Sequence, residues 1–330
     1  MSDDGAGGLA AQRKGVLFLR EEKKVFITGL GGFTGRYLAS ELLANGYEVF
    51  GTVRRESVVH GATCYVCDIN DREGLTSLLA SVQPEFIVHL AGISFAAYGC
   101  ASEVYRINLL GTLALLEAIS SSGCKPQKIL LAGSAHVYGN QKQSPLAETC
   151  PPAPVSDYAV SKLAMEYLVR LWFDRLPIVV TRSFNYTGAG QAAVFLPPKI
   201  VGHFARREPE IELGNLDVAR DWSDVRDVVK IYRLLLESPA HSVVVNVCSG
   251  KSHTLQYVLD TLTEISGHSL MVRVNQAFVR SNEVRELRGD NSLLRSLIGE
   301  LPGRPLYETL TWMYQTELAL CRCTAGDCKQ

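Results

Sequence analysis

The chain has 330 residues, of which 47% are hydrophobic and 20% charged, and its formal net charge is −1. This composition is typical of a globular protein with one large domain or two modest ones. The balanced charge gives no electrostatic reason to expect nucleic acid or an anionic membrane as a partner, and no apolar run approaches the length of a membrane span.

The two ends of the chain differ in composition from its middle. Residues 1–22 begin acidic and Gly-rich and lack a cationic segment before a long apolar core, which favours a flexible extension over a signal peptide. The nine cysteines are scattered, mostly in apolar segments. This pattern favours buried free thiols in a reducing cytoplasm. Cys321, Cys323 and Cys328 have no nearby histidine, so we expect no metal site and a flexible tail over residues 321–330.

Short apolar runs alternate with helical patterns along the first two thirds of the chain. The pattern predicts helices over residues 35–46 and 106–120, and strands over residues 24–30, 47–53, 63–69, 86–92, 128–134 and 177–185. Strands that alternate with helices indicate a parallel sheet with right-handed crossovers, which is the Rossmann-type doubly wound α/β fold. We assign residues 23–188 to this dinucleotide-binding domain.

The pattern changes after residue 188, where the loops lengthen. A further strand is predicted over residues 242–250, and helices over residues 255–266 and 301–318. We therefore expect residues 189–320 to form mainly a smaller C-terminal α/β lobe, with some strands and helices returning to the Rossmann core. This lobe would cover the carboxyl edge of the sheet and enclose a cleft for a substrate.

Gly29, Gly32 and Gly35 stand at GxxGxxG spacing between the first predicted strand and the first predicted helix. Glycines at these positions permit a tight turn, close approach of the backbone to a pyrophosphate, and close packing of helix on strand. The helix N-terminus would then face the phosphates. The loop therefore predicts a dinucleotide site, to which the neighbouring Thr28, Phe33 and Thr34 are also assigned.

The end of the second predicted strand indicates which dinucleotide binds. A NAD site usually carries an acidic residue about twenty positions after the glycine loop, where it holds the ribose 2′-hydroxyl. Arg54 and Arg55 stand there instead, and guanidinium groups suit a 2′-phosphate, so NADP(H) is favoured and NAD(H) is the alternative. Asp68 is a candidate acceptor for the adenine amino group. The remaining candidate cofactor contacts are at strand ends: Ile69, Leu90, Ala91 and Gly92.

Tyr158 and Lys162 stand four residues apart in a predicted helix and share one face of it. Ser134 ends a predicted strand, so its side chain can meet the other two beside the nicotinamide. Hydride arriving at a carbonyl carbon creates an oxyanion that must be protonated, and Tyr158 is the candidate acid or base. Because a tyrosine pKa is about 10, we expect Lys162 to supply a neighbouring positive charge. The Ser134 hydroxyl can hydrogen-bond the substrate oxygen.

Several motifs together resemble the extended short-chain dehydrogenase/reductase family over roughly residues 24–315. They are TGxxGxxG, YxxxK, the serine four residues before Tyr138, and Asn108 in RINLLGT. The resemblance implies that Lys162 also holds the nicotinamide ribose and that Asn108 organises water or backbone behind Lys162. Taken singly, a helical Tyr–Lys pair is a common surface feature, and Asn108 can simply cap or kink its helix.

The C-terminal half resembles one branch of this family, the GDP-mannose 4,6-dehydratases and GDP-4-keto-6-deoxy-mannose reductases. The resemblance rests on residues 184–191, 213–229 and 280–290. It implies a small-molecule nucleotide-sugar substrate, with its GDP part held by Asn185, Arg220, Arg280 and Glu283. Arginine suits a diphosphate, and glutamate accepts from ribose hydroxyls or a guanine edge. The remaining candidate substrate contacts are Ser94, Lys199, Leu213 and Asn215.

His136 bears on which activity is expected. The resemblance implies that a 4,6-dehydratase carries a glutamate two residues before Tyr138, and His136 occupies that position. This favours NADP(H)-dependent reduction of a GDP-4-keto-6-deoxyhexose to a GDP-6-deoxyhexose such as GDP-rhamnose. A dehydratase or epimerase with His136 as acid or base is the alternative. A nonenzymatic dinucleotide-binding regulator is a minor alternative, disfavoured because Ser134, Tyr158 and Lys162 are retained.

The helix that carries Tyr158 and Lys162 also bears on assembly. Members of the resembled family dimerise through helices that include this one, and residues 159–173 are apolar enough for both a core and an interface. Met165, Leu168 and Trp172 stand at helical spacing. We therefore expect a homodimer, with a tetramer as the alternative, although core packing alone also explains this stripe.

Overall fold

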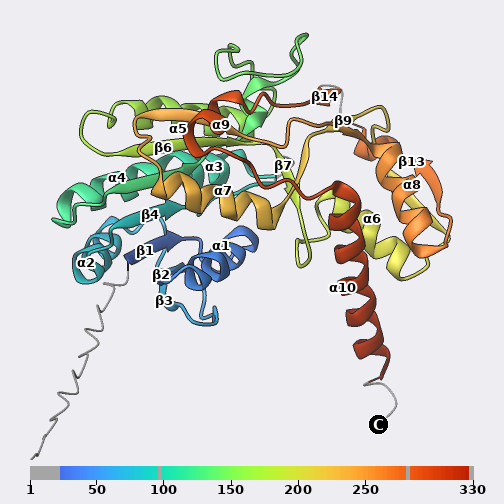
Figure 1. The fold of residues 1–330 in the computed structure, drawn as a ribbon, viewed down its shortest axis with the longest axis horizontal. Coiled ribbons are helices and arrows are strands. Elements are labelled where there is room, and N and C mark those ends of the chain that lie inside the picture. The colour runs from blue at the N-terminus through green and yellow to red at the C-terminus, as the bar shows by residue number, and fades with distance from the viewer. Residues whose placement is uncertain (1–22, 96–98, 280–282, 327–330) are drawn as a thin grey trace, which may run out of the picture.

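A seven-stranded parallel sheet forms the centre of the protein (Figure 1). The computed structural model describes residues 23–95, 99–279 and 283–326. The strand order is β11-β6-β5-β4-β1-β2-β3, and every neighbouring pair is parallel. The strands are β1 Lys23–Thr28, β2 Tyr47–Val53, β3 Thr63–Val66, β4 Phe86–His89, β5 Lys128–Ala132, β6 Ile178–Ser183 and β11 Val243–Val247. This order confirms the predicted doubly wound Rossmann-type fold.

Helices cover both faces of this sheet. One face carries α1 Phe33–Ala44, α7 Val225–Glu237 and α9 Ser292–Ile298, and the other carries α2 Arg72–Val82, α4 Gly111–Ser121 and α5 Asp157–Arg170. Alternate strand residues feed the two apolar cores: Ile27 and Val88 lie in one, Phe26 and Ile87 in the other. Because the strands are buried on both faces, they are continuous apolar runs in the sequence.

Smaller elements complete the Rossmann part at the carboxyl edge of the sheet. Helix α3, Ala101–Tyr105, and the π-helical segment η1, Arg106–Leu110, lead into α4. The 3-10 helix η2, Ala135–Tyr138, follows β5. Tyr138 donates a hydrogen bond to Asn246 Oδ1 at 2.7 Å, which fixes η2 to β11.

The C-terminal lobe lies beside the sheet, at the right of Figure 1. Its helices α6 Leu196–Ala205, α8 Leu255–Ser266 and α10 Leu306–Gly326 pack around a third core. Three small sheets accompany these helices: β7 Asn185–Thr187 with β10 Trp222–Asp224, β8 Glu210–Leu213 with β13 Met271–Val274, and β9 Ala219–Arg220 between β12 His253–Thr254 and β14 Glu286–Leu287. A 3-10 turn, η3 Gln276–Phe278, follows β13. Two elements from the same part of the chain belong to the Rossmann core instead: β11 is a strand of the central sheet, and α7 packs on one face of that sheet.

Several boundaries differ by a few residues from the sequence-based predictions, and two of these differences have a clear physical reason. The helix predicted over residues 301–318 begins at Leu306 and continues to Gly326, because the residues between Leu318 and Gly326 include neither glycine nor proline to end it. The strand predicted over residues 63–69 ends at Val66, since Asp68 accepts hydrogen bonds from Asn70 and forms a turn. The extension predicted over residues 1–22 and residues 327–330 lie outside the described residues.

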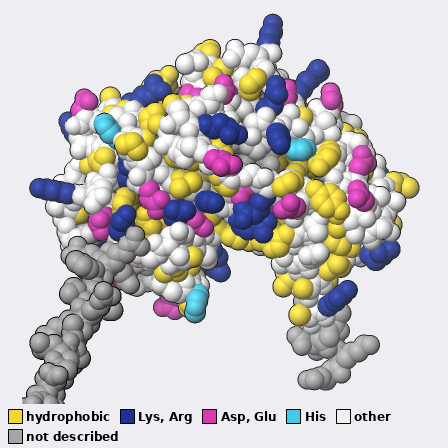
Figure 2. Space-filling view, in the orientation of Figure 1, with side chains coloured by type: hydrophobic (Ala, Val, Ile, Leu, Met, Phe, Trp, Pro, Cys, Tyr) yellow, Lys and Arg dark blue, Asp and Glu magenta, His cyan; other side chains and the backbone are white. Residues whose placement is uncertain are grey.

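The visible surface carries mixed charge. Figure 2 shows lysine and arginine side chains interspersed with aspartate and glutamate over this face, in agreement with the net charge of −1. Within the described ranges, every cysteine is a free thiol. No helix of that part of the chain is both long enough and apolar enough to cross a membrane.

Candidate active site

The glycine loop joins β1 to α1 at the carboxyl edge of the sheet. Gly29 has a φ of +76°, and a Cβ there would lie 2.7 Å from the backbone nitrogen of Ala91. A Cβ on Gly35 would lie 2.4 Å from the carbonyl oxygen of Gly29. The fold itself therefore requires glycine at both positions.

Gly32 has a different environment from these two glycines. It is the N-cap residue of α1, no side chain caps it, and a Cβ there would meet only the Gly29 carbonyl oxygen, at 3.1 Å. No side chain thus caps the first-turn N–H groups of α1. This arrangement fits the phosphates of a dinucleotide.

Thr28 and the residues after β4 brace this loop. The Thr28 hydroxyl lies 2.7 Å from His89 Nδ1 and accepts from the Ala91 N–H at 3.3 Å, and His89 Nε2 lies 3.0 Å from the Thr112 hydroxyl. Burial lowers the pKa of His89 to about 3, so the ring is neutral. Leu90 donates its N–H to the Thr28 carbonyl at 3.0 Å. Thr28 therefore aligns β1 with β4, through a histidine that sequence reasoning missed.

The other candidate cofactor residues lie around the ends of β2 and β3. Arg54 and Arg55 are exposed directly after β2, and Asp68 is exposed after β3. Hydrogen bonds from Asn70 hold the pKa of Asp68 below its usual value, and the charges of Arg106 and Arg54 lower it further. Ile69 is buried in a core beneath the sheet. The two arginines are thus accessible to a ligand, whereas the Ile69 side chain serves packing.

Tyr158 and Lys162 lie on one face of α5, and both are buried. The helix begins there because the Ser156 hydroxyl accepts from the Ala159 N–H at 3.2 Å. Burial raises the pKa of Tyr158, and a hydrogen bond with the Ser134 side chain opposes that rise. The pKa of Tyr158 is therefore raised overall. Desolvation outweighs the effect on this pKa that we expected from the positive charge of Lys162. Ser134 and Tyr158 are nevertheless brought together.

Lys162 is held by a backbone carbonyl and lies in the field of a buried ion pair. Its ammonium group donates to the Ala132 carbonyl oxygen at 2.8 Å. Burial lowers the pKa of Lys162 to about 8, and the charge of Glu166 opposes this shift. Glu166 in turn receives Arg182 Nε and Nη2 at 2.8–3.2 Å in a buried ion pair. The ammonium group is therefore oriented by fixed partners and titrates close to physiological pH.

Asn108 lies in the π-helical segment η1 and is buried. Its side chain accepts from the Ile93 N–H at 2.8 Å and donates to the Ile93 carbonyl at 3.1 Å and to the Ser161 hydroxyl at 3.0 Å. A Cβ on Gly92 would lie 3.0 Å from Asn108 Oδ1 and 3.5 Å from Lys162 Nζ. Asn108 thus fixes the backbone after β4 against Lys162.

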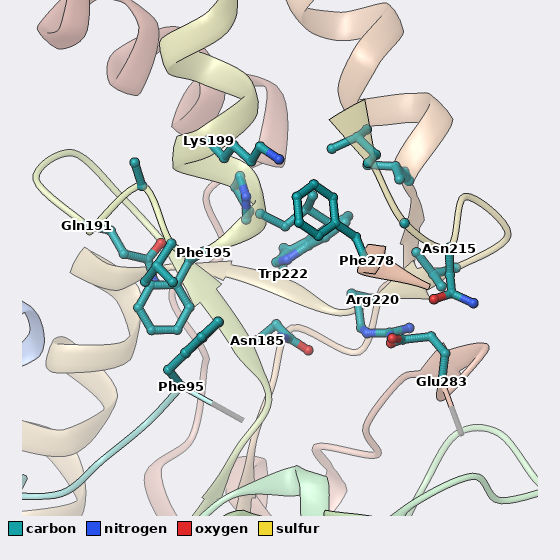
Figure 3. Close-up of a pocket in the computed structure, with 18 of the residues that line it drawn as sticks. Phe95, Asn185, Gln191, Phe195, Lys199, Asn215, Arg220, Trp222, Phe278 and Glu283 are labelled. Carbon is teal, nitrogen blue, oxygen red and sulfur yellow. The ribbon is translucent and has the colours of Figure 1, made fainter. Parts of the chain in front are cut away.

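A cavity of about 740 Å³ lies between the sheet edge and the C-terminal lobe (Figure 3). Most predicted substrate residues line it, namely Ser94, Asn185, Lys199, Leu213, Asn215, Arg220 and Glu283. Arg280 lies outside the described residues. His136 also lines the cavity, and its ring centroid lies 5.7 Å from that of Tyr158, edge to face. Segments far apart in the sequence therefore form one site.

Polar side chains of this cavity include Arg220 and Glu283 at one end, Asn185 in the middle and Gln191 at the other end (Figure 3). Arg220 forms an ion pair with Glu283 and donates to the Ala219 carbonyl at 2.9 Å. Lys199 donates to the Glu212 carbonyl at 2.6 Å, and its ammonium group lies 4.8 Å from the ring centroid of Phe278. Asn185 Oδ1 is buried and has no hydrogen-bond partner among the described residues. A buried acceptor without a partner is rare in folded proteins, and this one belongs to a residue that lines the cavity.

Aromatic residues of the cavity were missed from the sequence. Phe95, Phe195, Trp222 and Phe278 line it, and Tyr186 connects it to α1. The Tyr186 hydroxyl lies 2.9 Å from the Thr34 hydroxyl, and its ring stacks on Phe33 with centroids 6.4 Å apart. Phe33 and Thr34, which we predicted as cofactor contacts, therefore also hold Tyr186 in place at the cavity. In the sequence these aromatic residues are indistinguishable from core residues.

Known proteins are similar to this chain over most of its length. Residues 26–302 match the GDP-mannose 4,6 dehydratase family model. GDP-6-deoxy-D-talose 4-dehydrogenase of Aggregatibacter actinomycetemcomitans is 33% identical, over 84% of this chain and 91% of that protein. GDP-6-deoxy-D-mannose reductase of Pseudomonas aeruginosa is 31% identical, over 87% of this chain and 95% of that protein.

Solved structures agree with this relationship. A candidate epimerase from Burkholderia cenocepacia J2315 shares 46% identity, covers 90% of this chain and 98% of its own, and has a TM-score of 0.85. RMD from Pseudomonas aeruginosa, complexed with NADPH, shares 29% identity, with a TM-score of 0.79 over 91% of this chain and 98% of its own. The chain therefore belongs to the GDP-mannose 4,6-dehydratase family, a group of NAD(P)-dependent GDP-sugar oxidoreductases and dehydratases within the extended short-chain dehydrogenases/reductases.

Proposed function

We propose that the protein is an NADP(H)-dependent reductase of the 4-keto group of a GDP-4-keto-6-deoxyhexose. The observation that carries the proposal is the pairing of Ser134 with a buried, protonated Tyr158 next to a cavity that has His136, not a carboxylate, beside the tyrosine. The names of two relatives add support, because both describe oxidoreductases of a GDP-6-deoxyhexose.

Each residue has a role in the proposed reduction. A nicotinamide dinucleotide, when bound along the glycine loop, supplies the hydride that adds to C4. Ser134 donates a hydrogen bond to the carbonyl oxygen and orients it. Tyr158 transfers its phenolic proton to that oxygen, and its raised pKa keeps the proton in place at neutral pH. The Lys162 ammonium group stabilises the tyrosinate that remains.

The rest of the cavity suits the GDP part. Arg220 offers charge-assisted hydrogen bonds to a diphosphate, and Glu283 can accept from ribose hydroxyls. Asn185 Oδ1 supplies a buried acceptor between Arg220 and the aromatic residue Phe95 (Figure 3). We propose that Arg54 and Arg55 favour NADP(H) through its 2′-phosphate, since their guanidinium groups are exposed beside the loop.

The first test follows NADPH absorbance with GDP-4-keto-6-deoxy-mannose generated in situ. The proposal expects one NADPH consumed for each GDP-6-deoxyhexose formed. A His136→Asn variant, assayed alongside, should retain reduction because His136 transfers no proton in this mechanism. If NADPH and GDP both bind but no NADPH is consumed, the reductase proposal is wrong.

A dehydratase or epimerase is the second candidate, and the position of His136 favours it. The imidazole lines the cavity and packs against Tyr158, where it can move a proton at the carbon next to C4. GDP-mannose with catalytic NADP⁺ in deuterated water tests this candidate. Deuterium uptake or a 4-keto product, lost in His136→Asn, would support it over the reductase.

We also propose a homodimer through α5. Val160, Tyr167 and Leu171 share one face of this helix and are exposed, Leu171 by 74%. Met165, by contrast, is buried in the core, so the stripe predicted for an interface serves packing in part. Light scattering after size exclusion should show a dimer that Leu171→Asp converts to monomer. A wild-type monomer at micromolar concentration would contradict this proposal.

A further inference from the structure

The proposed function leaves one feature of the cavity without a role. Phe95 follows β4, and Phe195 is the N-cap residue of α6. Their ring centroids lie 5.8 Å apart with an interplanar angle of 83°, in edge-to-face contact. Figure 3 shows this aromatic pair on one side of the cavity, with Arg220, Glu283 and Asn215 on the other. The cavity thus has an aromatic end and a charged end.

Phe95 follows directly on the segment that is held against Lys162. Phe95 comes two residues after Ile93, whose N–H and carbonyl are both held by Asn108. Gly92, just before, approaches Lys162 so closely that a Cβ would lie 3.5 Å from Nζ. The segment from Gly92 to Phe95 therefore begins beside Lys162 and ends in the cavity.

The wall around the pair is apolar. Ala193, Val194, Leu196 and Pro197 line the cavity together with Phe195. Two polar side chains lie at the margin of this wall. Ser94 precedes Phe95, and the Gln191 amide is engaged within the protein, because its oxygen accepts from the Thr187 hydroxyl at 2.7 Å and its nitrogen donates to the Tyr186 carbonyl at 3.3 Å. The two phenylalanine rings and the four apolar side chains between these margins offer a substrate apolar contact in place of hydrogen bonds.

The chemistry of the sugar indicates what such a wall selects. In a 4-keto hexose, the reacting C4 is flanked by C3, with its hydroxyl, and by C5, which bears C6. We place the C4 oxygen at Ser134 and Tyr158 and the C3 hydroxyl at His136, which lines the cavity beside Tyr158. This orientation leaves the C6 group for the aromatic wall. A C6 hydroxyl against the two rings would lose its hydrogen bonds to water and gain none from the rings. A methyl group makes no hydrogen bonds to water, so its burial there carries no such cost.

We propose that Phe95 and Phe195 bind the C6 methyl group and make the site specific for 6-deoxy sugars over sugars with a C6 hydroxyl. This inference rests on the proposed function, whose substrate supplies the methyl group. The two phenylalanines are specificity-determining residues: they touch the sugar next to the reacting carbon and transfer no proton themselves.

GDP-6-deoxy-D-mannose and GDP-D-mannose test this inference, because they differ only in the C6 hydroxyl. Their dissociation constants, with that of GDP, are measured by calorimetry for wild type, Phe195→Ser and Phe195→Leu. Wild type is expected to bind the 6-deoxy sugar about 10- to 100-fold more tightly, the range over which an apolar pocket rejects an added hydroxyl. Phe195→Ser should bring this ratio within about two-fold of one, and Phe195→Leu should largely preserve it.

GDP affinity is the internal control, since GDP reports on the charged end alone. It should agree among the three proteins within about two-fold. A wild-type ratio near one, or an unchanged ratio in a folded Phe195→Ser variant, would overturn the inference. Failure of wild type to bind GDP and both sugars would instead overturn the proposed function and the inference with it. If Phe195→Ser does not fold, Phe95→Ser carries the same expectation.

Discussion

The glycine loop and the substrate cavity adjoin the same edge of the sheet but are assembled differently. The loop takes its residues from one short stretch, in which Gly29 and Gly35 approach backbone atoms too closely for any side chain. The cavity draws on segments spread from Ser94 to Glu283. A residue of the loop therefore acts through local backbone geometry, whereas a residue of the cavity acts through its distant partners.

Tyr158→Phe tests the point at which the two regions meet and should have the largest effect. Without the phenolic proton, turnover should fall by about 10²- to 10⁴-fold. The affinities for NADPH and GDP should stay near wild type, because neither region loses its own contacts. Single-turnover kinetics and calorimetry measure both quantities. A variant within ten-fold of wild-type turnover would exclude Tyr158 as the acid.

Two glycine substitutions should distinguish a glycine of the loop that is needed for packing from one that is needed for phosphate binding. Gly35→Ala places a Cβ 2.4–2.5 Å from two carbonyl oxygens, so it should lower the free energy of unfolding by about 1–3 kcal/mol. Gly32→Ala replaces a favourable N-cap residue and meets a single carbonyl oxygen at 3.1 Å, so it should lower the free energy of unfolding by less, about 0.5–1 kcal/mol, but weaken NADPH binding. Chemical denaturation and calorimetry of both variants check this. Equal loss of stability in the two would refute the distinction.

Arg220→Ala tests the charged end of the cavity. It removes a partly desolvated guanidinium and leaves Glu283 without its ion-pair partner, so GDP affinity should fall by about 10- to 100-fold. NADPH affinity should not change. The matched control is Arg273→Ala, which breaks an exposed ion pair with Glu210 on the same lobe and should affect neither ligand. Comparable GDP affinities of the two variants would argue against Arg220 as a ligand.

The pH dependence tests Lys162. Because its pKa is lowered to about 8, reductase turnover should decline as pH rises through 8 and the ammonium group loses its proton. The unfolded lysine keeps its proton up to its usual pKa of 10.5, so the unfolded state binds more protons between these values. Stability should therefore rise with pH across that window, and Lys162→Met should lose this rise. An alkaline limb of the turnover profile above pH 10 would contradict this account.

Arg54→Ser should have the smallest effect, a change in cofactor preference. Removing one exposed guanidinium beside the loop should reduce the ratio of NADP(H) to NAD(H) affinity by about ten-fold. Fluorescence titration with both dinucleotides measures this ratio. If NAD(H) is already the tighter ligand of the wild-type protein, the NADP(H) proposal is wrong.

Much of the fold and part of the site can be read directly from the sequence. Strands buried on both faces are continuous apolar runs, so residues such as Val25–Thr28 and Ile178–Val180 predict a parallel sheet. The glycine spacing and the four-residue separation of Tyr158 and Lys162 depend on short-range geometry alone, and the structure bears out that geometry. The end of α10 was misjudged, because scattered terminal cysteines carry no clear helix-stop signal.

Long-range packing decided the rest. Arg220 and Glu283 are 63 positions apart, and only the tertiary structure shows them as an ion pair. The contact of Phe95 with Phe195 and the neutral His89 between two threonines likewise join separate elements. The upward shift in the pKa of Tyr158 has the same origin, because desolvation depends on everything that surrounds the phenol and not on the lysine one turn away. Sequence spacing thus determined which groups could act, and packing determined their partners, their protonation and the shape of the cavity between them.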